Sequence, residues 1–73
     1  MIKLGKLYKT KSRMFMWLMN EKPVTVKENA VIVPIEYINL KNGAYTDIAL
    51  KVLTQDAKIG YFLSYGNLIE VTT

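Results

Sequence analysis

The stretch KIGYFLSYGNLIEVTT, Lys58 to Thr73, contains the strongest fold signal in this chain. Two apolar runs in it are separated by Tyr65-Gly66-Asn67, and the second run starts immediately after the break. Glycine and asparagine both tolerate positive φ, so the break predicts a tight reversal or a sharp bend that carries one strand to the next. A simple hairpin between the two runs is the alternative.

The pattern of alternating residues continues outward from this stretch. Apolar side chains occupy every second position in the segments 31–37, 48–52 and 59–65. This period of two is typical of half-buried strands. Turn-forming residues separate the runs at short intervals, as in a small β-barrel or sandwich. We therefore predict an all-β fold, organised as a single domain over residues 1–73.

Three local features refine this prediction. Pro34 cannot donate a ladder hydrogen bond, so its strand is expected at a sheet edge or with a bulge. Asn42-Gly43 is the strongest hairpin signal. The run Met14–Asn20 has no polar face, and we interpret it as a strand that is buried in the core or against another subunit.

The composition favours self-association. A chain of 73 residues is near the lower size at which one core suffices, and without cysteine it has no disulfide to support that core. Hydrophobic residues make up 51% of the sequence, which is high for so short a protein. We expect such a chain to bury apolar surface against copies of itself.

All of the net positive charge lies at the amino terminus. The chain carries +4 overall, and its first twenty residues contain five bases and no acid. These bases are Lys3, Lys6, Lys9, Lys11 and Arg13. A basic cluster interleaved with apolar residues fits a polyanion, while the simpler interpretation is a solvated basic face.

The sequence offers little for catalysis or cofactor binding. It contains no histidine or cysteine, so Ser12 and Ser64 have no evident activating base. The six acids form no spaced cluster of metal ligands, and the glycines are too dispersed for a phosphate-binding loop. We expect no enzyme activity, no metal and no cofactor.

The sequence has no pattern typical of a signal peptide or a membrane span. The apolar run Met14–Met19 follows lysines, but six residues are too few for a signal peptide. No stretch approaches the roughly 20 apolar residues of a membrane span. The expected location is the cytoplasm, without a membrane partner.

One resemblance carries a functional expectation. The segment FLSYGNLIEV, residues 62–71, is similar to the second signature motif of the Sm and Sm-like RNA-binding proteins, with Tyr65 where the family usually has arginine. EYINL at 36–40 resembles the first motif, and KPVTV at 22–26 resembles the opening strand. Divergent members of this length occur among marine and phage-derived sequences, and a phage-encoded protein would act in the host cytoplasm.

This resemblance implies a small five-stranded barrel of the SH3-like or Sm-like type. It implies a homo-oligomeric ring of five to seven subunits that binds single-stranded RNA or DNA, with RNA expected. In such rings the fourth strand of one subunit pairs with the fifth of the next, and the runs 59–65 and 68–71 are suitable edges. The base-binding positions of the family correspond to Tyr37, Asn39, Tyr65, Gly66 and Asn67.

Tyr65 has two possible roles. It could stack on a base, as an aromatic ring in place of the arginine of the family. Alternatively, it belongs to a core stripe with Ile59, Tyr61 and Leu63, where truncation would cost stability instead.

A second resemblance leaves the function open. KVLTQDAKIGYF, residues 51–62, resembles the paired strands of Src-homology-type barrels, which bind peptides or other proteins. Its tyrosines and tryptophan would then form a peptide groove. A small structural or inhibitory protein that binds one host protein is a third possibility.

Overall fold

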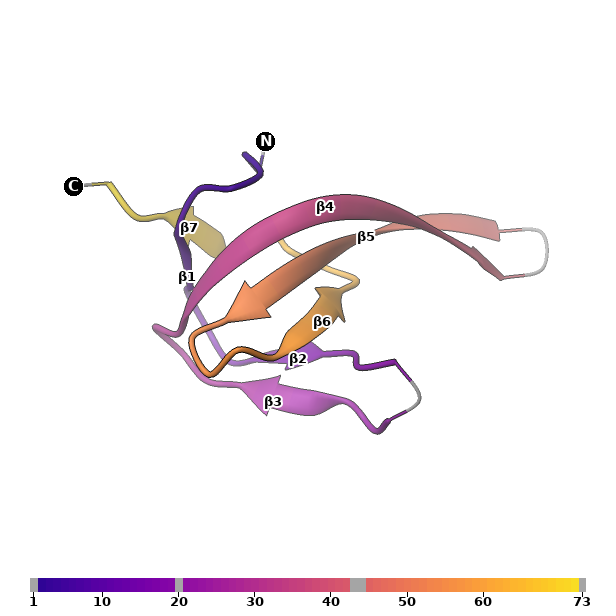
Figure 1. Cartoon of the computed structure of the whole chain (residues 1–73), viewed down its shortest axis with the longest axis horizontal. Coiled ribbons are helices and arrows are strands. Elements are labelled where there is room, and N and C mark those ends of the chain that lie inside the picture. The colour runs from indigo at the N-terminus through magenta and orange to yellow at the C-terminus, as the bar shows by residue number, and fades with distance from the viewer. Residues whose placement is uncertain (1, 20, 43–44, 73) are drawn as a thin grey trace.

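The computed structural model describes residues 2–19, 21–42 and 45–72. These residues form seven β-strands and no helix (Figure 1), so the prediction of an all-β fold is confirmed. The strands are β1 (Tyr8–Thr10), β2 (Met14–Met16), β3 (Val24–Val26), β4 (Val31–Asn42), β5 (Tyr45–Thr54), β6 (Ile59–Phe62) and β7 (Leu68–Glu70).

The strands form two antiparallel sheets. Five strands make one sheet in the order β6-β5-β4-β1-β7, and β2 pairs with β3 in a second sheet. A bridge between Trp17 and Tyr61 joins the second sheet to β6. In this bridge each residue's backbone N–H donates to the carbonyl oxygen of the other, at 2.8 Å in both directions. The two sheets thus curve around a shared interior (Figure 1).

The longest element is the β4–β5 hairpin. Its ladder runs from Ile32↔Thr54 to Asn42↔Tyr45, which agrees with the predicted reversal, although Gly43 itself lies outside the described residues. In β4, only the first two residues, Val31 and Ile32, pair with β1. In β5, only residues 50–53 pair with β6. The far part of the hairpin therefore projects as a two-stranded arm (Figure 1).

The strand of Pro34 was expected either at a sheet edge or with a bulge, and the structure shows the bulge. The β4–β5 register shifts between Pro34 and Glu36. β4 nevertheless lies inside the sheet, between β5 and β1. The Pro34 carbonyl accepts a hydrogen bond from the Gly5 N–H at 2.8 Å, so the chain before β1 runs beside the bulge.

The core lies between the two sheets. Its fully buried side chains come from β2, β4, β5 and β6, and Thr10 of β1 is buried with them. The largest are Phe62, Met16, Ile32, Leu50, Val52, Thr10 and Pro34. Thr10 is satisfied there, since its hydroxyl donates to the Lys27 carbonyl at 2.6 Å and accepts from the Ala30 N–H at 3.0 Å.

The core stripe that was the alternative interpretation of residues 59–65 is wrong at Ile59 and Leu63. Ile59 and Leu63 are 51% and 48% exposed, whereas Phe62 between them is fully buried. Both sets of alternate positions in this segment carry apolar residues, so the sequence alone does not identify the inner set. The pairing Leu50↔Phe62 decides it, because directly opposed residues of a ladder share one face. Tyr65 is only partly buried, and it packs against the edge of the core.

Gly60 of β6 lies in close contact with Met16 and Trp17. A Cβ built at this position would lie 3.0 Å from the Trp17 carbonyl oxygen and 2.7 Å from the Met16 sulfur. Met16 is 1% exposed, so its side chain has little free space to move into. The glycine therefore permits the bridge between the sheets.

We expect Gly60→Ala to lower the free energy of unfolding by about 1–3 kcal/mol, the usual cost of overpacking a core. Urea denaturation measures this loss. Gly66→Ala is the matched control, because a Cβ at that position would meet nothing within 4 Å. A Gly60→Ala protein as stable as the wild type would contradict the close approach.

The break at Tyr65-Gly66-Asn67 is a bend and not a hairpin. β7 pairs with β1 and not with β6, so the chain crosses from one end of the sheet to the other. The expectation of positive φ at this bend is wrong. Among the described residues, the left-handed conformations occur at Gly5, Asn29 and Ala57, where φ is 81°, 64° and 63°.

The apolar run Met14–Asn20 contains the predicted strand, which is shorter than the run. β2 covers Met14–Met16, with both methionines buried and Phe15 exposed between them. Trp17 continues the pairing as the bridge to β6. Asn20 lies outside the described residues.

Candidate functional site

An open groove of about 850 Å³ brings together four of the residues predicted to bind bases. Tyr37 and Asn39 enter it from β4, and Tyr65 and Gly66 enter it from the bend before β7. The two pairs are distant in sequence. They meet because β4 and β7 both flank β1 in the sheet.

Five further residues that the sequence did not single out complete the lining. They are Ile2, Tyr8, Ile48, Leu68 and Glu70. Strand register explains several of them, since Tyr8 lies opposite Glu70 across the β1–β7 ladder and Asn39 lies opposite Ile48 across β4–β5. No local motif identifies these positions, since Tyr8, Glu70 and Ile48 reach the groove through ladder pairing and Ile2 reaches it from outside the strands.

The two groove tyrosines contact each other edge to face. Their ring centroids are 6.1 Å apart, with 60° between the ring planes. The Tyr37 hydroxyl donates a hydrogen bond to the Ile2 carbonyl at 3.0 Å, which ties the chain start to the groove rim. Tyr37 is 39% exposed, so it still presents aromatic surface to a ligand.

The polar groups around the tyrosines are few. Asn39 is exposed and offers both an amide donor and a carbonyl acceptor. Among the residues that the structure describes, Glu70 is the only charged one that lines the groove, and its carboxylate pairs with the Lys3 ammonium at 3.6 Å. The open space around Gly66 means that packing does not require a glycine there.

Asn67 lies outside the groove. It lines a shallow hollow of about 270 Å³ with Arg13, Phe15 and Trp17. Its backbone carbonyl accepts a hydrogen bond from the Lys11 N–H at 2.7 Å. The bend at residues 65–67 thus separates the groove from the hollow.

The amino-terminal bases do not form one patch. Lys3 is paired with Glu70 at the groove, whereas Arg13 lines the hollow. Lys9 is exposed between the buried residues of β1, so it points to the other face of the sheet from Tyr8. Within the described residues, Lys6, Lys9, Lys11 and Arg13 make no ion pair.

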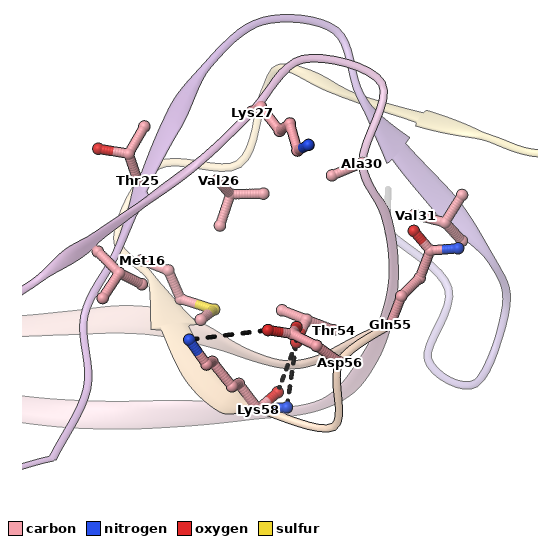
Figure 2. A pocket seen from close by; sticks show the side chains of 11 residues that line it. Met16, Thr25, Val26, Lys27, Ala30, Val31, Thr54, Gln55, Asp56 and Lys58 are labelled. Atoms are coloured by element: carbon pink, nitrogen blue, oxygen red, sulfur yellow. Dashed lines mark hydrogen bonds and ion pairs between the residues drawn. The ribbon is translucent and has the colours of Figure 1, made fainter.

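A separate cavity of about 300 Å³ lies beside the turn between β5 and β6 (Figure 2). The Thr54 hydroxyl donates a hydrogen bond to the Asp56 carboxylate, and the Lys58 ammonium forms an ion pair with the same carboxylate at 3.7 Å. The Thr54 hydrogen bond, the Asp56 backbone N–H and the Lys58 charge together lower the pKa of Asp56. None of the predicted site residues lines this cavity, and its polar contacts serve the turn.

The described part of the chain contains no group of three or more acidic, histidine or cysteine side chains placed to hold a metal. It also contains no helix long and apolar enough to cross a membrane. Comparison of the chain with protein-family models, curated proteins and solved structures finds no match. The groove geometry is therefore the main argument about function.

Proposed function

We propose that this protein binds single-stranded nucleic acid, with bases held in the Tyr37–Tyr65 groove. One observation carries the proposal: two tyrosines and an asparagine from distant segments line a single open groove. Aromatic rings stack on bases of any sequence, and an amide can bond to base edges. The resemblance to the Sm-like family supports RNA as the preferred ligand.

Charge around the groove supports the proposal. The Lys3 ammonium offsets the Glu70 carboxylate, which would otherwise repel phosphates. Lys11 is exposed, and its backbone N–H bonds to the carbonyl of Asn67, which follows the groove residues 65 and 66 and lies at the hollow. Lys6 is exposed in the segment that runs beside Pro34. These two lysines are the proposed phosphate contacts.

A small barrel of the Sm-like or SH3-like type remains our proposal for the complete architecture. Five antiparallel strands and a second sheet joined through Trp17 support it. A homo-oligomeric ring of five to seven subunits stays a prediction. β6 and β7 are the two edge strands of the five-stranded sheet, and a ring needs two such edges to pair with neighbouring subunits. The Trp17 backbone, however, already forms hydrogen bonds with Tyr61 along the edge of β6. A strand from a neighbouring subunit would have to displace Trp17 from this edge.

Salt dependence tests the phosphate contacts. The logarithm of affinity for a labelled single-stranded RNA should fall with log salt by about 0.7 per neutralised phosphate. We expect Lys6→Ala/Lys11→Ala to reduce this slope by roughly one to two units, measured by fluorescence anisotropy. Lys22→Ala/Lys27→Ala removes the same charge from exposed positions on the two sides of β3, which belongs to the second sheet, and should leave the slope unchanged. An unchanged slope in the first variant would show that those lysines are only a solvated face.

A peptide-binding barrel is the second candidate. Ile2, Ile48 and Leu68 give the groove an aliphatic wall that bases do not need. Such a wall, with tyrosines opposite, suits apolar side chains of an extended peptide. If no single-stranded RNA or DNA binds at low salt, the nucleic-acid proposal fails and this second function is preferred.

A further inference from the structure

Five large apolar side chains are exposed on the surface formed by β2, β5, β6 and the residues that follow β2 and β6. We call this surface the outer face, and its residues are Phe15, Trp17, Leu53, Ile59 and Leu63. Phe15 is 67% exposed and Trp17 is 44% exposed. None of the five lines the groove.

Strand register shows that the outer face is continuous. Trp17 is bridged to Tyr61, so both side chains lie on the same side of the joined strands. Ile59 and Leu63 share that side with Tyr61, because alternate residues of a strand point the same way. Leu53 lies opposite Ile59 in the β5–β6 ladder and extends the face by one more strand.

The face carries almost no net charge. Lys51 lies opposite Tyr61, and its ammonium pairs with Glu36 at 3.6 Å. Arg13 is the exposed base at the margin, in the hollow beside Phe15 and Trp17. Two copies of this face can therefore meet without bringing like charges together at the centre. A strongly charged partner would meet no opposite charges on this face.

The exposed area is larger than a compact monomer requires. The chain exposes 5461 Å², whereas a folded monomer of 8.4 kDa is expected to expose about 4,600 Å². This excess of about 850 Å² belongs to the whole chain, including the projecting β4–β5 arm. An interface of standard size would bury roughly 800 Å² of each partner, so a dimer contact is within the surface that the chain exposes.

We propose that the outer face is the contact surface between two copies of this chain. A two-fold dimer places the same patch of both subunits together, so it needs a patch that is neutral and apolar at its centre. The outer face has both properties. The contact uses side chains on a sheet face, and it is therefore independent of strand-edge pairing in a ring and of the nucleic-acid groove.

Solution mass tests the proposal on the full chain. Analytical ultracentrifugation should give twice the 8.4 kDa chain mass for the wild type at high micromolar concentration, whereas the ring would give five to seven times that mass. Phe15→Glu/Leu63→Glu places carboxylates on both copies and should give the monomer mass. Leu4→Glu is the matched control, since Leu4 is 46% exposed and lies outside the outer face. It should retain the dimer.

Circular dichroism separates dissociation from unfolding. If the glutamate pair unfolds the chain, the milder Phe15→Ser/Leu63→Ser pair replaces it and should raise the dimer dissociation constant by at least tenfold. A folded wild-type monomer at high concentration overturns the proposal. So does a wild-type assembly whose mass the folded outer-face variants do not change, which would place the interface elsewhere.

Discussion

Tyr65→Ala is expected to weaken binding of single-stranded RNA by about 5- to 150-fold, which corresponds to the roughly 1–3 kcal/mol of one base-stacking site. Tyr65 lines the groove and meets Tyr37 edge to face, with 6.1 Å between ring centroids. Truncation of Tyr65 would remove one of the two aromatic rings that can stack on a base. It would also remove the ring contact that holds Tyr37 in place. Fluorescence anisotropy with a short labelled oligonucleotide measures the loss.

Two variants act as controls for this effect. Tyr65→Phe should bind nearly as the wild type does, because stacking uses the ring and not the hydroxyl. Phe15→Ala removes an equally aromatic but groove-distant ring, which is 67% exposed, and should leave binding to a single site unchanged. If Phe15→Ala weakens binding as much as Tyr65→Ala does, stacking is not specific to the groove.

Thermal melting must accompany these binding measurements. Tyr65 is partly buried and packs against the core, so Tyr65→Ala is also expected to lower the melting temperature. The base-binding assignment requires that the folded fraction still binds more weakly. A protein that melts many degrees lower but binds normally when folded would make Tyr65 a structural residue only.

Phe62→Ala is expected to give the largest loss of stability, about 3–5 kcal/mol. Phe62 is fully buried and is the largest such side chain in the core. Its truncation would leave a cavity among Met16, Leu50 and Val52, which are buried in the same cluster. Urea denaturation measures the change, and for so small a domain the protein is expected to be largely unfolded.

The neighbouring residue supplies the matched control. Leu63 is 48% exposed on the other side of the chain, so Leu63→Ala should change the free energy of unfolding by no more than about 0.5 kcal/mol when both proteins are measured at concentrations low enough to keep the chain monomeric. The comparison tests directly which side of β6 faces the core. Equal losses from both substitutions, or a greater loss from Leu63→Ala, would reverse the assignment.

The sequence by itself determined the all-β class and the approximate positions of several strands. Alternation of apolar residues is a local property, and it marks the segments of β4, β5 and β6 as strands. Burial follows the expected set only at Leu50 and Val52 of β5, whereas Ile32 and Pro34 of β4 and Phe62 of β6 are buried from the other set. Pro34 signalled its bulge because proline lacks an N–H, and Asn42 signalled a reversal because turn residues act locally. Tyr37 and Tyr65 could also be singled out, but only through resemblance to known motifs.

Tertiary structure alone decided which alternate set is buried and which segments meet. In β6 both sets are apolar, and the hydrogen-bonded register opposite β5 places Phe62 inside and Tyr61 outside. The groove depends on β7 crossing to pair with β1, which brings Gly66 and Glu70 near β4. The alternation of side chains along a strand is a local property of the sequence. Which alternate set faces the core, and which segments lie close together, is set by long-range backbone pairing, which no short stretch of sequence specifies.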